Sequence, residues 1–427
     1  QGHLHEIDDQ LDIFRPITKW AHRVTKPGEI PEAVHEAFRH LKTGRPRPVE
    51  LEIPPDTLMA SDDITIVEPE EYPRPTGRAS DLQRAGQLLA HAKHPAIVAG
   101  GGAVCAGASS ELLDLAEYLQ APVLASRQGK SIIPNDHYLF TGVHFYVPDP
   151  WQRALNDADV ILAVGTRFLV TGLELKPHQK VIQIDVDPDQ FGRTHAVELG
   201  IEADAKASLA AILDQLKQIT KPRESRRAEM EKAQQDFEKR IRSLVPEQTG
   251  ILDAIQGKLD DDAIVISGMT NIGYWAHSYL SSKLPGTYIT SSYFGTLGYG
   301  FPTALGAKVA MPDRQVVSIN GDGGFLFNPQ ELSTAATYNI AAVTLVFNNG
   351  VFGASNWDQT HRFNRRYIGT ELRNPDFMKL AEAFGVMGIR TAPDGLGKAL
   401  RKALDANAPV LIEVPLPNLM PPFQIVE

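Results

Sequence analysis

The chain has 427 residues, of which 43% are hydrophobic and 22% are charged, and its formal net charge is −10. These values are ordinary for a globular protein of two or three domains, and the negative charge argues against nucleic acid or an anionic membrane as the main partner. The single cysteine, Cys105, excludes an intrachain disulfide and a cysteine metal cluster, and it fits a reducing cytoplasm. No apolar run of about 18 residues predicts a membrane span.

The first block, residues 1–72, is predicted to contain an amphipathic helix over residues 31–44 and a strand over residues 47–56. Proline and glycine stand at the two ends of the helical stretch, and apolar residues alternate along the strand. One helix and one strand cannot bury both faces of a sheet. Because the sequence also starts without Met, we expect this block to be the C-terminal remnant of a larger domain.

Residues 73–220 are predicted to form a central α/β domain. Short apolar runs alternate there with helical patterns, and the runs lack strict apolar–polar alternation. This is typical of strands in a parallel sheet that is covered on both faces. The predicted strand segments are 94–102, 121–126, 158–168 and 180–188.

The rest of the chain is predicted to be a helical connector and a second α/β domain. Residues 221–245 are rich in charge and are interpreted as a solvated helical connector. Residues 246–427 repeat the strand–helix alternation, with apolar runs at 262–268, 286–292, 314–324, 341–349 and 408–415. The predicted fold class is therefore α/β, with doubly wound parallel-sheet domains, two complete and one partial.

Three features of the central domain could suggest a ligand, but a structural interpretation is favoured for each. In "VAGGGAVCAG" the third glycine of a dinucleotide fingerprint is replaced by Cys105, so a tight strand-to-helix turn explains the glycines. In "LASRQGKS" the first glycine of a P-loop is replaced by Leu124. Asp185 and Asp187 precede Pro188, which favours a turn or cap over a cation site. The histidines show no zinc-hydrolase spacing.

Polar residues follow two strand-like runs of the C-terminal domain. Asp322 lies in Gly-Asp-Gly-Gly after one run, and the next run ends in Asn348 and Asn349. If these strands are neighbours, Asp322 and Asn349 face one crevice, where bare glycine backbone can approach an anion. A carboxylate, an amide oxygen and a backbone carbonyl suit Mg²⁺, which would complete its shell with diphosphate oxygens and water. Two polar strand ends can also be simple helix caps, so the residues alone leave both interpretations open.

The wider pattern resembles the thiamine diphosphate motif of the acetolactate synthase and pyruvate decarboxylase superfamily. Besides G-D-G and the later N-N, segment 290–307 and the stretches "RPITKWAHRV", "VAGGG", "AVGTRF" and "IQIDVDP" occur in family order along essentially the whole chain. The resemblance implies sheets of the thiamine diphosphate-binding type and an enzyme that acts on a 2-oxo acid with thiamine diphosphate and Mg²⁺. It also implies that residues 1–72 are the C-terminal remnant of the pyrimidine-binding domain and that residues 246–427 are the diphosphate-binding domain. A homodimer or homotetramer is implied as well, because the cofactor lies between subunits in this family.

The resemblance also implies roles for individual residues. Asp322, Asn349 and the carbonyl of Val351 would bind Mg²⁺. Two loops would hold the diphosphate, and they contain Thr270, Asn271, Gly323 and Gly324.

Further carried-over residues concern the organic part of the cofactor and the substrate. Leu297 matches the bulky residue that bends the cofactor into a V shape, and the carbonyl of Gly295 would accept a hydrogen bond from the aminopyrimidine. Phe352, Trp357 and His361 follow the asparagine pair, in the segment that would cover the substrate, and are candidates to line it; Phe352 would also contact the cofactor.

Three departures from the family pattern bear on the activity. The glutamate that manages the pyrimidine proton would lie upstream of residue 1, so this chain alone could be inactive. Leu4 and His5 replace a Phe-Gln pair, and His5 is either a catalytic proton donor or a surface histidine. Residues 165–172 lack the acidic pair and second arginine typical of flavin-binding members, so no FAD is expected although Arg167 is present.

These departures leave the reaction open between several alternatives. The first is decarboxylation of a 2-oxo acid with carboligation, as in acetolactate synthase. The others are a simple decarboxylase of the benzoylformate type, a diketone C–C lyase or hydrolase, and a catalytically inactive cofactor-binding subunit.

Overall fold

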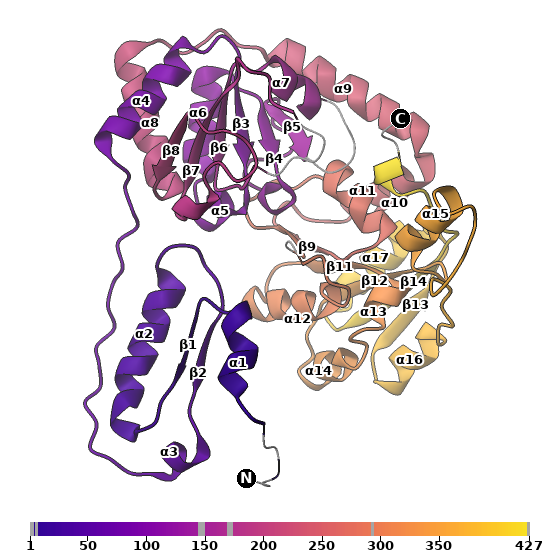
Figure 1. Cartoon of the computed structure of the whole chain (residues 1–427). Coiled ribbons are helices and arrows are strands. Elements are labelled where there is room, and N and C mark those ends of the chain that lie inside the picture. The colour runs from indigo at the N-terminus through magenta and orange to yellow at the C-terminus, as the bar shows by residue number, and fades with distance from the viewer. Residues whose placement is uncertain (1–3, 5–6, 144–149, 169–173, 292–293, 425–427) are drawn as a thin grey trace.

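The framework of the molecule is three parallel sheets, seen in a computed structural model that describes residues 4, 7–143, 150–168, 174–291 and 294–424. One sheet has two strands and the other two have six each, and neighbouring strands in all three run parallel. Figure 1 shows the three sheets in separate lobes, with helices around the two larger sheets. The predicted α/β class with doubly wound parallel sheets is confirmed, whereas the predicted domain boundaries stay predictions.

The N-terminal lobe is a small β-α-β unit. β1 (Trp20–Arg23) and β2 (Val49–Glu52) pair in parallel, and α2 (Ile30–Lys42) connects them. Two short helices, α1 (Gln10–Phe14) and α3 (Pro55–Met59), flank the pair. The helix and the second strand agree with the sequence prediction. β1 is not predicted, because Trp-Ala-His-Arg shows no alternation of apolar and polar residues.

The central sheet has the strand order β5-β4-β3-β6-β7-β8. The chain adds strands on one side of β3 and then, from β6 on, on its other side, as in doubly wound folds. Its strands are β3 (Pro95–Ala99), β4 (Val123–Ala125), β5 (Phe140–Val143), β6 (Val160–Val164), β7 (Lys180–Asp185) and β8 (Leu199–Glu202). Its helices are α4 (Ala79–His91), α5 (Gly101–Cys105), α6 (Ser109–Leu119), α7 (Trp151–Asp157) and α8 (Ala205–Ile219). β5 and β8 are not predicted, because each four-residue run contains a glycine and so resembles a turn.

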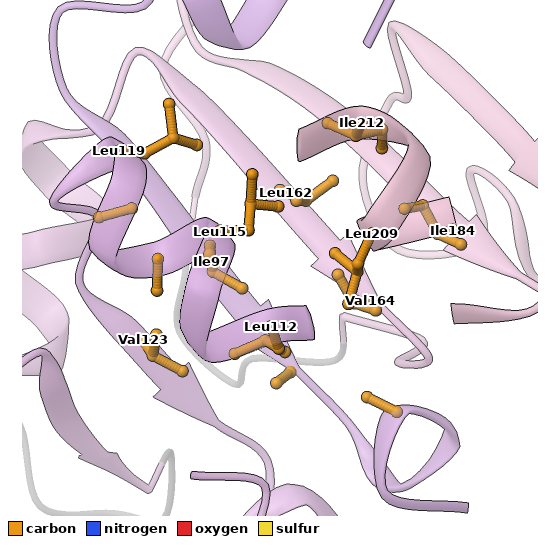
Figure 2. Close-up of a cluster of buried hydrophobic side chains, with 14 of the residues drawn as sticks. Ile97, Leu112, Leu115, Leu119, Val123, Leu162, Val164, Ile184, Leu209 and Ile212 are labelled. Atoms are coloured by element: carbon orange, nitrogen blue, oxygen red, sulfur yellow. The ribbon is translucent and has the colours of Figure 1, made fainter. Parts of the chain in front are cut away.

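Side chains from two helices bury one face of the central sheet. Figure 2 shows Leu112 and Leu115 of α6 and Leu209 of α8 gathered over Ile97 and Leu162 of the sheet, and all five are fully buried. A second buried cluster covers the opposite face. Because both faces are covered, the strands are apolar throughout, which is why the sequence shows continuous runs there.

Two features of this domain that resemble ligand motifs have structural roles. A side chain at Gly102 would lie 2.8 Å from the Cα atom of Gly165, so the glycines permit close contact between the turns after β3 and β6. Asp187 caps a short helical turn, since its Oδ1 accepts a hydrogen bond from the Asp189 amide at 3.2 Å. The structural interpretation of both motifs is therefore confirmed.

The C-terminal sheet has the strand order β10-β9-β11-β12-β14-β13. Its strands are β9 (Ile264–Ser267), β10 (Tyr288–Thr290), β11 (Val316–Gly321), β12 (Val343–Asn348), β13 (Met387–Arg390) and β14 (Val410–Pro415). Its helices are α10 (Pro246–Gln256), α11 (Asn271–Tyr279), α12 (Gly300–Ala310), α13 (Asp322–Phe325), α14 (Glu331–Thr337), α15 (Gly353–His361), α16 (Phe377–Ala383) and α17 (Leu396–Asp405). Gly321 of β11 lies opposite Phe347 of β12, so the segments that follow these strands meet at one edge of the sheet.

The charged helix between the two large sheets is α9 (Arg227–Leu244). Met230 near its start is buried in the core of the central sheet, and Ile241 near its end is buried in the core of the C-terminal sheet. Gln234 also donates hydrogen bonds to the carbonyls of His137 and Phe140 at 3.0 and 2.8 Å. This helix therefore packs against both cores. In the part of the chain that the structure describes, no helix has the length and apolar character needed to cross a bilayer.

Candidate functional site

A cavity of about 290 Å³ lies at the carboxyl ends of β9, β11 and β12. Ligands of open α/β sheets collect at this edge, near the point where the strand order reverses. Every residue that the sequence predicts to bind the cofactor or the metal lines this cavity, except Gly295. The lining residues are Met269, Thr270, Asn271, Tyr274, Leu297, Gly321, Asp322, Gly323, Gly324, Asn349, Val351, Phe352, Gly353, Ala354 and Ser355.

Asp322 is a buried carboxylate held by three hydrogen bonds. Its Oδ1 accepts from the Gly323 amide at 2.9 Å, and its Oδ2 accepts from the Gly350 amide and the Asn374 side chain, both at 2.7 Å. Burial raises the pKa of the Asp322 carboxyl, and these hydrogen bonds oppose that rise. The side chain is thus oriented at the end of β11, with one of its two oxygens bonded to a single donor.

Asn349 and Val351 lie beside Asp322, as the neighbouring positions of β11 and β12 require. The Asn349 Oδ1 accepts from the Val351 amide at 3.2 Å, so the segment turns sharply after β12. Val351 forms an isolated antiparallel bridge with Glu371, whose two hydrogen bonds use the Gly350 carbonyl and the Phe352 amide. The bridge therefore does not use the Val351 carbonyl. No group of three or more His, Cys, Asp or Glu side chains suited to a metal occurs among the described residues.

The loop after β9 supplies a second wall of the cavity. Thr270 immediately precedes α11, and Asn271 is its first residue and is 7% exposed. The Asn271 Nδ2 donates to Asn418 Oδ1 at 3.0 Å and to the Leu419 carbonyl at 2.8 Å. Its Oδ1 is buried and makes no hydrogen bond within the described part of the chain. A buried acceptor without a partner is costly, so this atom suits a site where a ligand supplies the missing donor.

Glycines keep the floor of the cavity open. A side chain at Gly324 would approach Leu297 Cδ2 at 3.7 Å, and one at Gly323 would lie 2.6 Å from the ring of Phe352. Bare backbone at both positions therefore brings Leu297 and Phe352 against the chain after β11. The predicted placement of these four residues around one cavity agrees with the structure, although their roles stay predictions.

Other predicted residues lie away from the cavity wall. Gly295 has a left-handed φ of 59°, and a side chain there would lie 3.4 Å from Met269 Cε, so it is near the wall without lining it. Trp357 and His361 stack on each other at 4.5 Å along α15 and do not line the cavity. His5 lies outside the described residues, as do residues 169–173 of the stretch used to argue against FAD.

Two polar residues of the site are not predicted from the sequence. Asn374 donates to Asp322, and Asn418 accepts from both Asn271 at 3.0 Å and Asn349 at 3.3 Å. Both come from loops far along the chain, and neither stands directly after a strand that ends at the cavity. No local pattern in the sequence around either residue predicts these contacts.

Two family models match the chain. "Thiamine pyrophosphate enzyme, central domain" matches residues 82–212, and "Thiamine pyrophosphate enzyme, C-terminal TPP binding domain" matches residues 268–414. A probable acetolactate synthase large subunit of Methanocaldococcus jannaschii is 36% identical over 430 residues, which cover 95% of this chain and 73% of that protein. The chain belongs to the thiamine pyrophosphate enzyme family. The whole cavity wall lies within the matched C-terminal domain of this thiamine pyrophosphate enzyme.

Other relatives carry related names. The acetolactate synthase large subunit of Corynebacterium glutamicum is 34% identical over 436 residues, covering 95% of this chain and 68% of its own length. A probable 2-ketoarginine decarboxylase of Pseudomonas aeruginosa is 32% identical over 421 residues, covering 97% of this chain and 74% of its own length. The predicted resemblance to acetolactate synthase-like thiamine diphosphate enzymes is confirmed.

Proposed function

We propose that this protein binds thiamine diphosphate with Mg²⁺ in the cavity at the end of β11 and β12, and that it acts on a 2-oxo acid. The observation that carries the proposal is the placement of Asp322 and Asn349 at the ends of neighbouring parallel strands on one cavity wall. Family membership supports the cofactor, and the residue chemistry supports the metal.

The charge of the cavity supports a requirement for a cation. Asp322 is the one ionisable carboxylate among the lining residues of the described chain, and no lysine or arginine lines the cavity. A diphosphate would meet a negative charge there with no cationic side chain to offset it. A divalent cation between the two would remove that repulsion. Asp322, Asn349 and the Val351 carbonyl are hard oxygen donors, the kind that Mg²⁺ prefers, and diphosphate and water would complete its shell.

The remaining cavity residues suit the other parts of the cofactor. Gly323, Gly324 and the Thr270–Asn271 loop would contact the diphosphate, while Leu297 and Phe352 would contact apolar ring atoms. The bound cofactor would supply an electron sink for the loss of CO₂ from a 2-oxo acid. The chain itself would orient the cofactor through these contacts and hold the metal through the Asp322 carboxylate.

For the reaction, we favour decarboxylation with carboligation, of the acetolactate synthase type. The support is that two of the relatives described above, including the 36% identical one, are named acetolactate synthase large subunits. The decarboxylase name of a 32% identical relative keeps simple decarboxylation as the second candidate. Free aldehyde as the sole product would favour this second candidate, and a hydroxy-ketone would favour carboligation.

A homodimer or homotetramer, a cytoplasmic location and the absence of FAD are further parts of the proposal. Light scattering of the purified protein tests the oligomer. Visible flavin absorbance of the purified protein tests the last point, since bound FAD would be seen directly.

The proposal is tested by calorimetric titration with thiamine diphosphate, with and without Mg²⁺. We expect binding that needs Mg²⁺, and its loss in Asp322→Ala, because that change removes the charged metal ligand. Exposed Asp394→Ala is the matched control and should bind as the wild type does. Undiminished Mg²⁺-dependent binding in Asp322→Ala would refute the assignment of the metal site.

A further inference from the structure

We propose that Asn374 is a positioning residue for the metal carboxylate, and that Asn348 and Glu413 fix the orientation of its amide. These three side chains form one chain of hydrogen bonds that ends at Asp322. The inference rests on the proposed function, because it concerns how the chain prepares Asp322 for a cation. Asn374 does not line the cavity, so it acts through Asp322 and not on the cofactor itself.

The first step is the contact between Asn374 and Asp322. The Asn374 Nδ2 donates to Asp322 Oδ2 at 2.7 Å, and the same oxygen accepts from the Gly350 amide at 2.7 Å. The other oxygen, Oδ1, accepts from the Gly323 amide alone. With Oδ2 engaged by two donors, Oδ1 is the oxygen with more remaining capacity to bind a cation. Asn374 therefore helps to determine which oxygen of Asp322 is left to bind the cation.

The second step is that the Asn374 amide cannot turn over without cost. Its Nδ2 also donates to Asn348 Oδ1 at 2.8 Å, so both of its hydrogens are used. A reversed amide would place its carbonyl oxygen against two acceptors, Asp322 Oδ2 and Asn348 Oδ1. In the observed orientation, the Asn374 Oδ1 is buried and without a hydrogen bond among the described residues. The Asn374 carbonyl oxygen is thus left without a donor, while both hydrogens of its Nδ2 stay bonded to Asp322 and Asn348.

The third step is that Asn348 is itself held in place. Its Nδ2 donates to Glu413 Oε1 at 2.8 Å, which directs its Oδ1 toward Asn374. Glu413 is 2% exposed, and its other oxygen accepts from Arg390 Nε at 2.6 Å. A buried carboxylate paired on one side and accepting an amide on the other has little freedom to rotate. This chain of hydrogen bonds therefore connects the Arg390–Glu413 ion pair of β13 and β14 with Asp322, which lies on the other side of β12.

The same arginine also helps to fix the loop that carries Asn374. Arg390 donates to Asp376 Oδ1 at 3.0 Å, and Asp376 caps α16 through the amides of Met378 and Lys379. Asp376 is two residues from Asn374, so the loop is fixed at both points. Partners that orient metal ligands in this way typically change metal affinity by about 10- to 100-fold when removed.

The test compares Asn374→Ala with the wild type by the Mg²⁺ concentration that half-saturates thiamine diphosphate binding, followed by calorimetry. We expect this concentration to rise by about 10-fold or more in the variant, in line with losses at similar partners. At saturating Mg²⁺ the affinity for thiamine diphosphate should return close to the wild-type value. Asn374→Ser, which keeps a shorter donor, should lie between the two and carries the test if the alanine variant does not fold.

The matched control is Asn135→Ala, since Asn135 also donates twice, to the carbonyls of Lys130 and Ile133, away from the cavity. It should leave the Mg²⁺ requirement unchanged. An unchanged requirement in folded Asn374 variants would overturn the inference, as would a loss of cofactor affinity at every Mg²⁺ concentration with a lower Tm, which would indicate a merely structural role. If the wild type itself shows no Mg²⁺-dependent binding, the proposed function fails together with the inference.

Discussion

The substitution Lys130→Met should stabilise the protein, and more at neutral than at alkaline pH. Lys130 lies between the central and C-terminal lobes and is 1% exposed. Its Nζ donates to the His277 carbonyl at 2.8 Å and lies 5.0 Å from the centre of the Tyr288 ring. Burial lowers the pKa of Lys130 from 10.5 to about 7, and burial also lowers the pKa of the neighbouring His277. Among the described residues, no carboxylate pairs with Lys130.

The magnitude follows from the difference in pKa between the folded and unfolded chain. Because the folded-state pKa is the lower one, the unfolded chain binds more protons between about pH 7 and pH 10.5, and stability rises with pH across this window. Each pKa unit corresponds to about 1.4 kcal/mol, so the charged lysine costs several kcal/mol near pH 6.5 and about 3 kcal/mol less at pH 9.5. Methionine has a similar volume and does not titrate.

Differential scanning calorimetry at pH 6.5, 8 and 9.5 measures the effect. The Tm of Lys130→Met should exceed that of the wild type most at pH 6.5, and the difference should shrink as the pH rises. Exposed Lys402→Met is the matched control and should show no such trend. A difference in Tm between Lys130→Met and the wild type that stays constant with pH would refute the reasoning, because it would mean that Lys130 is not held as a buried, easily deprotonated amine.

Two further predictions concern the cavity. Gly323→Ala should weaken thiamine diphosphate binding at least about 10-fold, because the new Cβ would lie 2.6 Å from the Phe352 ring. The control Gly306→Ala has open space around the new Cβ in α12, so it should leave binding unchanged and raise the Tm. Equal cofactor affinities of the two variants would contradict the argument. Leu297→Ala should weaken cofactor binding while shifting the Tm of the cofactor-free protein by only a few degrees, since Leu297 lies at the cavity and is only partly buried. Calorimetric titration and thermal unfolding measure both, and unchanged cofactor affinity in Leu297→Ala would contradict its predicted contact.

The parts of the site that the sequence predicts are those with a local signal. Asp322 and Asn349 each stand directly after a long apolar strand, so their common edge follows from the rule for parallel sheets. Asn374 lies 52 residues from Asp322 and within an irregular loop, so nothing near it in the sequence indicates the contact. The same holds for Asn418. Tertiary packing alone brings these amides against the residues that line the cavity.

The fold shows the same division. Long apolar strands such as β11 and β12 are predicted, whereas β1, β5, β8 and β13 are not, because they have four residues each and lack a clear pattern. Helix α9 is predicted to be solvated, since half of its residues are charged. Met230, Phe237 and Ile241 share one face of this helix, but only a few apolar residues mark it among the charged ones, and their burial depends on two separate cores.

The central claim is that Asp322, Asn349 and Val351 bind the cation that accompanies thiamine diphosphate. A crystal structure of the protein with thiamine diphosphate and Mn²⁺, with the metal located by anomalous scattering, tests it most directly. The account predicts one Mn²⁺ ion bound by a carboxylate oxygen of Asp322, the Asn349 side-chain oxygen and the Val351 carbonyl, next to the diphosphate. A cofactor bound in this cavity with its metal on other residues, or with no metal, would contradict it.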